Sequence, residues 1–229
     1  MSEPDDINLD RVWTSVAAEV WRRNPGWLER TAARLLRSPG LARALLTTPS
    51  LLVPWLISTV VVFGAGALLR LGPGQPAVWL LAPAVAAVGI ACAYGPGIDP
   101  AWELCYSMAV SERMVLLTRA VAVFAVNAVL GLAASAASGA AASLTFGWLL
   151  PMTAICGLTL AVAVAARSAT VGAAAGVAAW VITVLANRTA SGQLTATVTN
   201  TETYLPYLAA AACAAVAVAY VTRPQRGLP

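Results

Sequence analysis

The amino-acid sequence predicts an all-α, polytopic membrane protein with six transmembrane helices. Between Leu51 and Val221 the chain contains six apolar stretches, each long enough to cross a bilayer core of about 30 Å as an α-helix. Hydrophobic residues make up 59% of the chain and charged residues 10%, and the mean hydropathy is +0.76, outside the range of an ordinary soluble domain. The predicted spans are residues 51–69, 77–94, 114–136, 147–166, 169–187 and 204–221.

The segment before the first span, residues 1–48, is predicted to be an arginine-rich, cytoplasmic or interfacial helical segment. It carries seven arginines, with Trp and Leu residues recurring between them at helical spacing. A helix with Arg on one face and Trp and Leu on the other lies in the membrane surface and is attracted to anionic lipid. We expect an interfacial anchor, or a helix that also contacts a cytoplasmic partner. Residues 49–222 then form the transmembrane domain and residues 223–229 a cytoplasmic tail.

The arginines also predict the orientation of the chain. All 14 basic residues are arginines, and an N-terminus inside the cell places twelve of them on the cytoplasmic side, with Arg70 and Arg188 outside. Positive residues favour the cytoplasmic side, so we expect both termini in the cytoplasm. The membrane is expected to be a bacterial plasma membrane. The arginines expected at the membrane interface are Arg34, Arg37, Arg43 and Arg119, the last reaching the interface from the third span.

The residue types that are missing exclude several kinds of chemistry. The chain has neither Lys nor His, which excludes a P-loop, a histidine-based triad and a histidine-ligated zinc site. No Asp, Glu or Lys falls within a predicted span, so a proton relay and intramembrane hydrolysis lack their machinery. We therefore expect no enzymatic activity and no bound cofactor, and the net charge of +4 is taken as topological information rather than a sign of nucleic-acid binding. Asn127, the amide in mid-span, forms a hydrogen bond across helices or lines a polar path.

Small and aromatic residues give further expectations. The glycines of Gly172–Gly176 form a small-xxx-small pattern, which permits close packing within the chain or a dimer face. Cys92, Cys156 and Cys213 lie in apolar stretches and are expected to be small buried hydrophobic residues, while Cys105 lies in a loop. Aromatic residues are expected to mark the membrane interfaces. Those at the outer interface are Trp79, Trp148, Tyr204 and Tyr207, and those at the inner interface are Tyr94 and Tyr220.

The sequence predicts a short amphipathic helix in the loop between the second and third spans. Asp99 is a suitable N-cap, and Pro100 suits the first helical position. An apolar face follows, made of Trp102, Cys105, Tyr106 and Ala109, and Glu103 and Glu112 supply charge. Such a helix lies on the membrane or inserts into a groove on another protein.

The run WELCYSMAVSERMVLLTRAVAVFAVNAVLGL, from Trp102 to Leu132, resembles the corresponding loop and third helix of type-2 ATP-binding-cassette (ABC) exporter permeases. In such permeases a "WEL…S…S…R…LLxR" segment lies between spans two and three. Six spans, an amphipathic helix before the first, and two cytoplasmic ends also match. The resemblance covers Leu41 to Val221. The chain departs from family members that have a large outer domain or re-entrant helices before the last span, because only the Thr-rich stretch 188–203 stands there.

The resemblance implies a membrane-spanning subunit that carries no ATPase, dimerises with a second permease copy, and is moved by a partner subunit that binds ATP and magnesium. The short loop helix would be the coupling helix that contacts this ATPase. The contact residues implied are Asp99, Trp102, Glu103, Tyr106, Ser107, Glu112 and Arg113. The expected cargo is a small or hydrophobic substrate, and the second copy is identical or different.

Two alternatives belong to other classes. A non-transporting membrane regulator, or an anchor for a cytoplasmic signalling protein, would bind its partner through the arginine-rich N-terminal segment. An ion-coupled secondary transporter is weakened by the missing intramembrane carboxylates.

Overall fold

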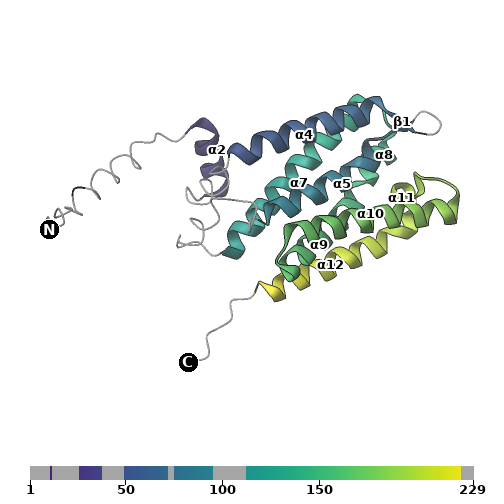
Figure 1. The fold of residues 1–229 in the computed structure, drawn as a ribbon. Coiled ribbons are helices and arrows are strands. Elements are labelled where there is room, and N and C mark those ends of the chain that lie inside the picture. Colours follow the sequence, from purple (N-terminus) through teal and green to yellow (C-terminus); the bar gives the residue numbers. More distant parts are fainter. Residues whose placement is uncertain (1–10, 12–25, 38–48, 72–74, 95–111, 223–229) are drawn as a thin grey trace, which may run out of the picture. The chain divides into compact units, whose positions relative to one another are not determined.

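The structure is a computed structural model of the chain and describes residues 11, 26–37, 49–71, 75–94 and 112–222. The chain divides into two compact units, Met1–Leu46 and Thr47–Pro229, which are considered separately. In the first unit, α2 spans Trp27–Leu36 (Figure 1). The elements of the second unit are α4 (Pro49–Leu68), β1 (Arg70–Leu71), β2 (Gln75–Pro76), α5 (Val78–Ala93), α7 (Glu112–Ala137), α8 (Ala142–Gly147), α9 (Leu149–Ala166), α10 (Ala169–Ser191), α11 (Ala196–Thr199), η1 (Thr201–Thr203) and α12 (Tyr204–Val221).

Apart from the two-residue strands, the described residues of the second unit form an all-helical bundle. Helices occupy all six stretches in which spans were predicted. Four segments are long and apolar enough to cross a membrane, and the helices Trp55–Leu68 and Val78–Ala93 are shorter apolar segments. The four long segments are Met114–Ala137, Ala142–Ala166, Ala169–Ser191 and Thr201–Val221.

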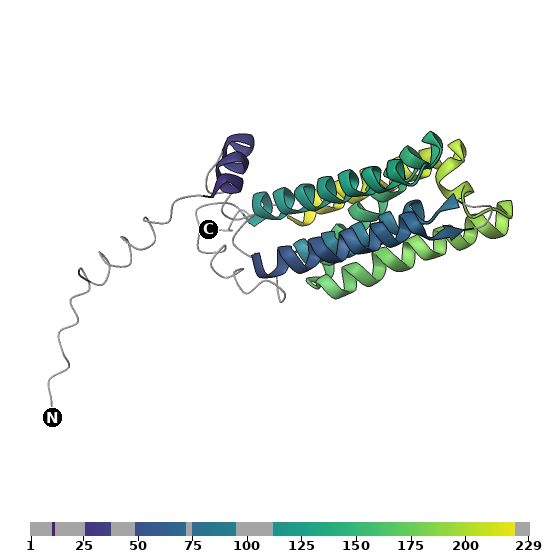
Figure 2. The ribbon, with the colours of Figure 1, turned by 90° about the horizontal axis from the view of Figure 1, so that it is seen from above.

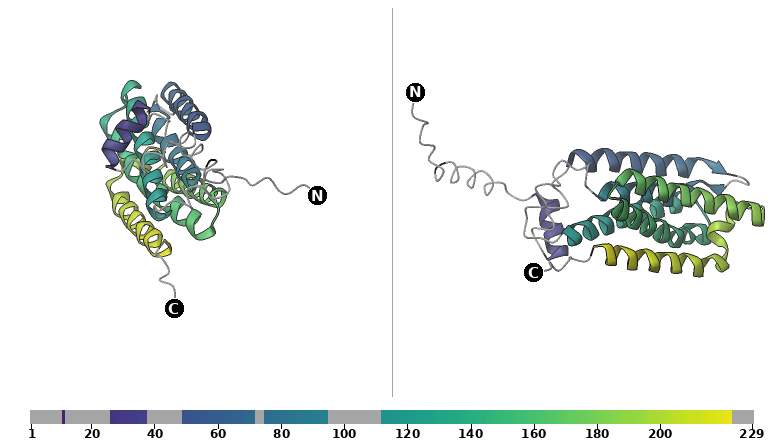
Figure 3. Two further views of the ribbon diagram at one scale, coloured as in Figure 1. Left: turned by 90° about the vertical axis from the view of Figure 1, so that its left-hand side faces the viewer. Right: turned by 60° about the horizontal axis from the view of Figure 1, so that its bottom comes forward.

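The helices of the bundle lie side by side along a common direction (Figures 1 and 2). Helix α5 is central and packs against α4, α7, α9 and α10, whereas α12 packs on the outside against α9. The β1–β2 pair, α8 and α11 gather at one end of the bundle, which we call the hairpin end (Figure 3). Helices α4, α7 and α10 begin at the opposite end, where α5, α9 and α12 finish.

Glycine allows the central helices to approach closely. A Cβ atom built on Gly172 would lie 2.6 Å from the Cβ of Ala163, and one built on Gly176 would overlap the hydroxyl of Thr159. Because α10 thus packs tightly against α9, the prediction that this glycine pair serves packing within the chain is confirmed. Gly176 also faces Ala87 of α5, so α5, α9 and α10 meet at this point.

Local chemistry explains where the helices end. Pro151 has no backbone N–H, so the carbonyl of Gly147 lacks its usual helical donor and the apolar segment Ala142–Ala166 is divided into α8 and α9. Helix α10 begins where the Ser168 hydroxyl accepts a hydrogen bond from the N–H of Val171, at 3.4 Å. It ends at Gly192, whose φ of 72° terminates the helix four residues later than the sequence pattern indicated.

The packing corrects several expectations for individual side chains. Trp79, Trp148, Tyr207 and Tyr94 are buried inside the bundle rather than on its surface, whereas Tyr204 and Tyr220 are exposed; their depth at the membrane interfaces stays a prediction. Burial is confirmed for Cys156 and wrong for Cys92 and Cys213, which are exposed on the bundle. These residues lie on helices that are apolar on every face, so hydropathy does not distinguish the side packed against neighbours from the outer side.

Candidate functional site

The segment implied to contact an ATPase falls largely outside the described residues. This applies to Asp99, Trp102, Glu103, Tyr106 and Ser107. Glu112 and Arg113 are the first two residues of α7, at the end of the bundle opposite the hairpin. Helix α7 continues from there without a break for 26 residues.

The arginines expected at the membrane interface occupy different surroundings. Arg34 and Arg37 are exposed at the end of α2, where Arg37 adopts a left-handed conformation with φ of 49° and terminates the helix. Arg43 lies outside the described residues. Arg119 is 8% exposed, so its side chain lies within the bundle two turns from the start of α7 rather than on the outer surface.

Asn127 lies in mid-helix on the buried side of α7, and its side chain is 0% exposed. Its amide nitrogen donates to the carbonyl of Val123 on the same helix at 2.8 Å, and its Oδ1 atom has no hydrogen-bond partner among the described residues. The described part of the chain therefore shows no cross-helix bond from this amide. Gly131 and Ser135 follow at four-residue spacing and are also buried, so the buried face of α7 carries small and polar side chains at these positions.

Further buried polar atoms gather in the bundle. The indole nitrogens of Trp79 and Trp148 and the hydroxyls of Thr159 and Thr197 are buried without hydrogen-bond partners among the described residues. Trp180 differs, because its indole N–H donates to the carbonyl of Leu80 on α5 at 2.8 Å. A buried polar group without a partner is costly in a low-dielectric interior, so each of these atoms weakens the packing around it.

The stretch 188–203, expected as a polar outer loop, is partly helical. Besides the last turn of α10 it contains α11 and η1, and α11 packs on α8 and α10. The hydroxyl of Tyr207 donates to the carbonyl of Thr197 at 3.2 Å and ties α12 to α11. A Cβ built on Gly147 would overlap the carbonyl oxygen of Val198, so glycine permits the contact between α8 and α11. This segment therefore forms an ordered cap on the hairpin end.

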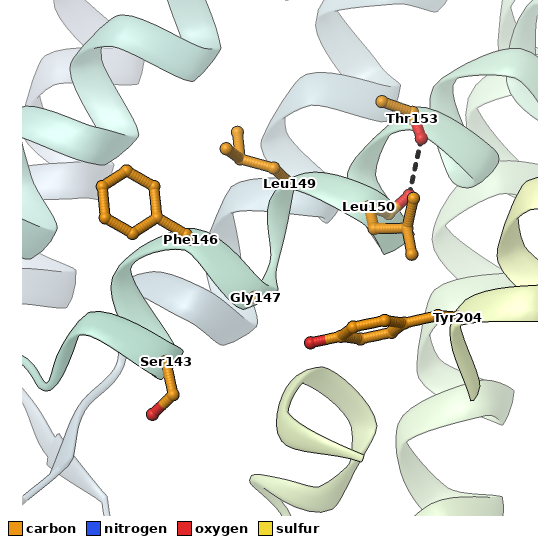
Figure 4. Close-up of a pocket in the computed structure, with 7 residues that line it drawn as sticks. All are labelled: Ser143, Phe146, Gly147, Leu149, Leu150, Thr153 and Tyr204. Atoms are coloured by element: carbon orange, nitrogen blue, oxygen red, sulfur yellow. Dashed lines mark hydrogen bonds between the residues drawn. The ribbon is translucent and has the colours of Figure 1, made fainter. Parts of the chain in front are cut away.

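A pocket of about 370 Å³ opens at this end, between the α8–α9 break and the first residue of α12 (Figure 4). We call it the α8–α12 pocket. Its lining residues are Ser143, Phe146, Gly147, Leu149, Leu150, Thr153 and Tyr204. None of them is charged, and the leucines and Phe146 make most of the wall apolar. In Figure 4 the ring of Tyr204 lies across the pocket, with its hydroxyl directed toward the side of Ser143 and Gly147.

The hydroxyl groups of the α8–α12 pocket differ in their hydrogen bonding. Thr153 donates to the carbonyl of Leu150 at 2.7 Å and is therefore engaged within α9. Ser143 and Tyr204 have no hydrogen-bond partner for their hydroxyls among the described residues. Both hydroxyls thus lack a partner within the described residues. In Figure 4 the Tyr204 hydroxyl lies across the pocket, whereas the Ser143 hydroxyl is turned away and reaches a ligand there by rotation about its Cα–Cβ bond.

Sequence reasoning did not single out this pocket. Tyr204 was expected at a membrane interface, and Ser143, Phe146 and Thr153 were given no role. The available signal was Pro151 four residues after Gly147, because this spacing breaks the helical hydrogen bonding. The packing that brings α12 next to the break could not be read from that spacing.

The described residues contain no group of three or more His, Cys, Asp or Glu side chains that could hold a metal ion. Comparison of the chain with protein-family models, curated proteins and solved structures finds no match. Among the described residues, the feature that could hold a ligand is the α8–α12 pocket.

Proposed function

We propose that the chain is the membrane-spanning permease subunit of an ABC exporter, moving a small or hydrophobic substrate with energy from a separate ATPase. In this proposal all six apolar helices cross the bilayer, α4 and α5 included, and both termini lie in the cytoplasm. Two permease copies, identical or different, enclose the substrate path. The ATPase binds ATP and magnesium, and this chain contributes movement rather than catalysis.

The observation that carries the proposal is the position of α7. It begins at Glu112, within the segment that resembles ABC permeases, and runs unbroken to the hairpin end. On the way it packs against α4 and α5, and its Gly131 contacts Trp148 at the α8–α9 break. A displacement at the beginning of α7 would therefore reach the other end of the bundle as a rigid-body movement, which is how packed helices transmit such changes.

The experiment is co-purification of the full chain with its ATPase in mild detergent, with bound subunits identified by mass spectrometry. The double variant Glu103→Arg and Glu112→Arg should lose the ATPase, because charge reversal at a polar contact opposes binding. Glu202→Arg is the matched control: it reverses an exposed glutamate in η1 and should leave the ATPase bound. Unchanged co-purification in the double variant contradicts the proposal.

A membrane regulator or signalling anchor is the second candidate, and α2 is the observation that favours it. Arg30, Arg34 and Arg37 are exposed and follow one another at helical spacing, which creates a basic face. Deleting residues 1–40 separates the two functions. A regulator loses its partner in this variant, whereas the permease retains its ATPase through the segment before α7.

A further inference from the structure

We propose that the α8–α12 pocket binds one acyl chain of a bilayer lipid, with the ester region of the lipid at the hydroxyls of Ser143 and Tyr204. The inference rests on one part of the proposed function, the insertion of the bundle in a bilayer. It does not depend on an ATPase or on transport. It assigns a lipid site to residues that the permease motif does not include.

The pocket lies nearer the hairpin end than the close contact of α9 with α12. Farther from the hairpin end, α9 and α12 are in contact, since a Cβ built on Gly157 would lie 3.1 Å from the Cβ of Ala214. Leu150 lies about two turns, or roughly 10 Å, nearer the hairpin end. There Leu150 of α9 and Tyr204 of α12 both line the pocket.

The shape and polarity of the pocket suit an acyl chain better than a headgroup. Its volume of about 370 Å³ lies at the small end of ligand pockets, which measure about 300–1,000 Å³, so it accommodates part of a lipid. None of its lining residues carries a charge that could pair with phosphate or with an amine. Leu149 and Leu150 supply an apolar wall for methylene groups.

The two free hydroxyls give the pocket a polar side. Ser143 and Tyr204 both can donate a hydrogen bond, and neither hydroxyl has a partner among the described residues. An ester carbonyl accepts hydrogen bonds and carries no charge, which matches an uncharged pocket with two donors. The Thr153 hydroxyl is already engaged with the Leu150 carbonyl, so we assign it no contact with the ester.

The surroundings of the pocket indicate that the ligand enters sideways from the bilayer. Phe146, which lines the pocket, and Leu205, which follows its Tyr204, are 60% and 78% exposed. The apolar surface continues along α12 through Leu208, which is also exposed. A bilayer lipid covering this surface reaches the pocket without crossing water, and this favours it over a ligand arriving from the aqueous phase.

The test uses the full chain in vesicles of phosphatidylethanolamine and phosphatidylglycerol containing a phosphatidylcholine with a diazirine in one acyl chain. Photolysis in the vesicles should label both the pocket peptide, residues 143–153, and the exposed face of α10 around Val181 and Ile182. In a second sample the protein is transferred to mild detergent before photolysis, which dilutes loosely held lipid. The labelling that remains, relative to that in vesicles, should then be at least about fivefold higher for the pocket peptide than for α10.

Two variants locate the retained lipid. Leu150→Trp fills the pocket and should lower the retained label at least about fivefold, while Leu208→Trp, on the exposed face of α12 outside the lining, should not. The double variant Ser143→Ala and Tyr204→Phe removes only two hydroxyls and should also lower it about fivefold, the expected effect of losing hydrogen bonds to a neutral acceptor.

The outcomes separate this inference from the proposed function. Equal retention at the pocket and at α10, or equal loss in Leu150→Trp and Leu208→Trp, shows surface lipid only and overturns the acyl-chain site. Retention unchanged by removal of the two hydroxyls overturns the assigned ester contact. Absence of label at both peptides in vesicles overturns bilayer insertion, and the permease proposal fails with it. Failure to find an ATPase leaves the lipid result unaffected.

Discussion

Gly131 of α7 lies directly against the indole of Trp148 at the α8–α9 break. A Cβ atom built on Gly131 would be 2.7 Å from Cη2 of Trp148, closer than real Cβ contacts allow. Trp148 is among the largest fully buried side chains of the described residues. The contact therefore connects the long helix that begins at the proposed ATPase-contact segment with the end of the bundle that holds the α8–α12 pocket.

The Gly131 contact predicts that Gly131→Val destabilises the bundle by about 1–3 kcal/mol, the usual cost of adding atoms to a well-packed interior. The measurement is the free energy of unfolding in detergent. Ala133→Val places the same side chain on the exposed face of α7 and should change that free energy by less than about 0.5 kcal/mol. Equal effects of the two variants would show that the close contact with Trp148 has no energetic weight.

A second prediction concerns the contact between Gly176 and Thr159. Gly176→Ala should destabilise the bundle by about 1–3 kcal/mol, since the added methyl overlaps a buried hydroxyl. Thr159→Ala removes that hydroxyl, which has no partner among the described residues, and should restore much of the loss in the double variant. A double-mutant cycle measures this coupling. Strictly additive effects would contradict the contact.

The location of the helices was predictable from the sequence to a large extent, because long apolar stretches, Pro and Gly mark them. Helix α7 covers residues 112–137 where 114–136 was predicted, and Ser168 and Gly192 bound α10 by ordinary capping chemistry. The orientation of each helix about its own axis was not predictable. Cys213 and Trp148 show why: an apolar residue suits an exterior facing lipid as well as an interior, so the hydropathy pattern has no preferred side.

The α8–α12 pocket was not predictable for a related reason. It depends on the position of Tyr204, at the start of α12, beside the α8–α9 break, and this is a property of the packed bundle. Sequence could indicate the helix break through Pro151 but not the neighbour that completes the pocket. By contrast, the segment proposed to contact an ATPase could be argued from the sequence alone, since most of it lies outside the described residues.

A third prediction uses two buried tryptophans with different hydrogen bonding. Trp180→Phe removes the bond from the indole to the Leu80 carbonyl, whereas Trp79→Phe removes an indole N–H with no partner among the described residues. Both variants leave a cavity, so the difference between their free energies of unfolding measures the contribution of the Trp180–Leu80 hydrogen bond. Trp180→Phe should be more destabilising by about 0.6–1.7 kcal/mol, from the average to the largest value measured for interhelical bonds in a membrane protein. Equal free energies of unfolding would argue against this α5–α10 bond.

The last prediction tests the orientation inferred from the arginines through the two ends of α10. In a variant lacking the native cysteines, Ala166→Cys lies at the end of α9 just before α10, and Gln193→Cys lies just beyond its far end; both positions are exposed. In intact cells a membrane-impermeant maleimide should label Gln193→Cys and leave Ala166→Cys unlabelled until the membrane is opened. This follows because Arg167 belongs to the arginine-rich side and the predicted outer side carries few arginines.

Val181→Cys, on the exposed apolar face of α10, serves as the control and should resist the impermeant reagent from either side, since a bilayer covers it. Labelling of both end positions in intact cells would mean that α10 does not cross the membrane. The reversed pattern would keep the crossing but place the beginning of α7 outside the cell. An ATPase in the cytoplasm could not then reach Glu112, so the orientation of this one helix decides whether the permease proposal is physically possible.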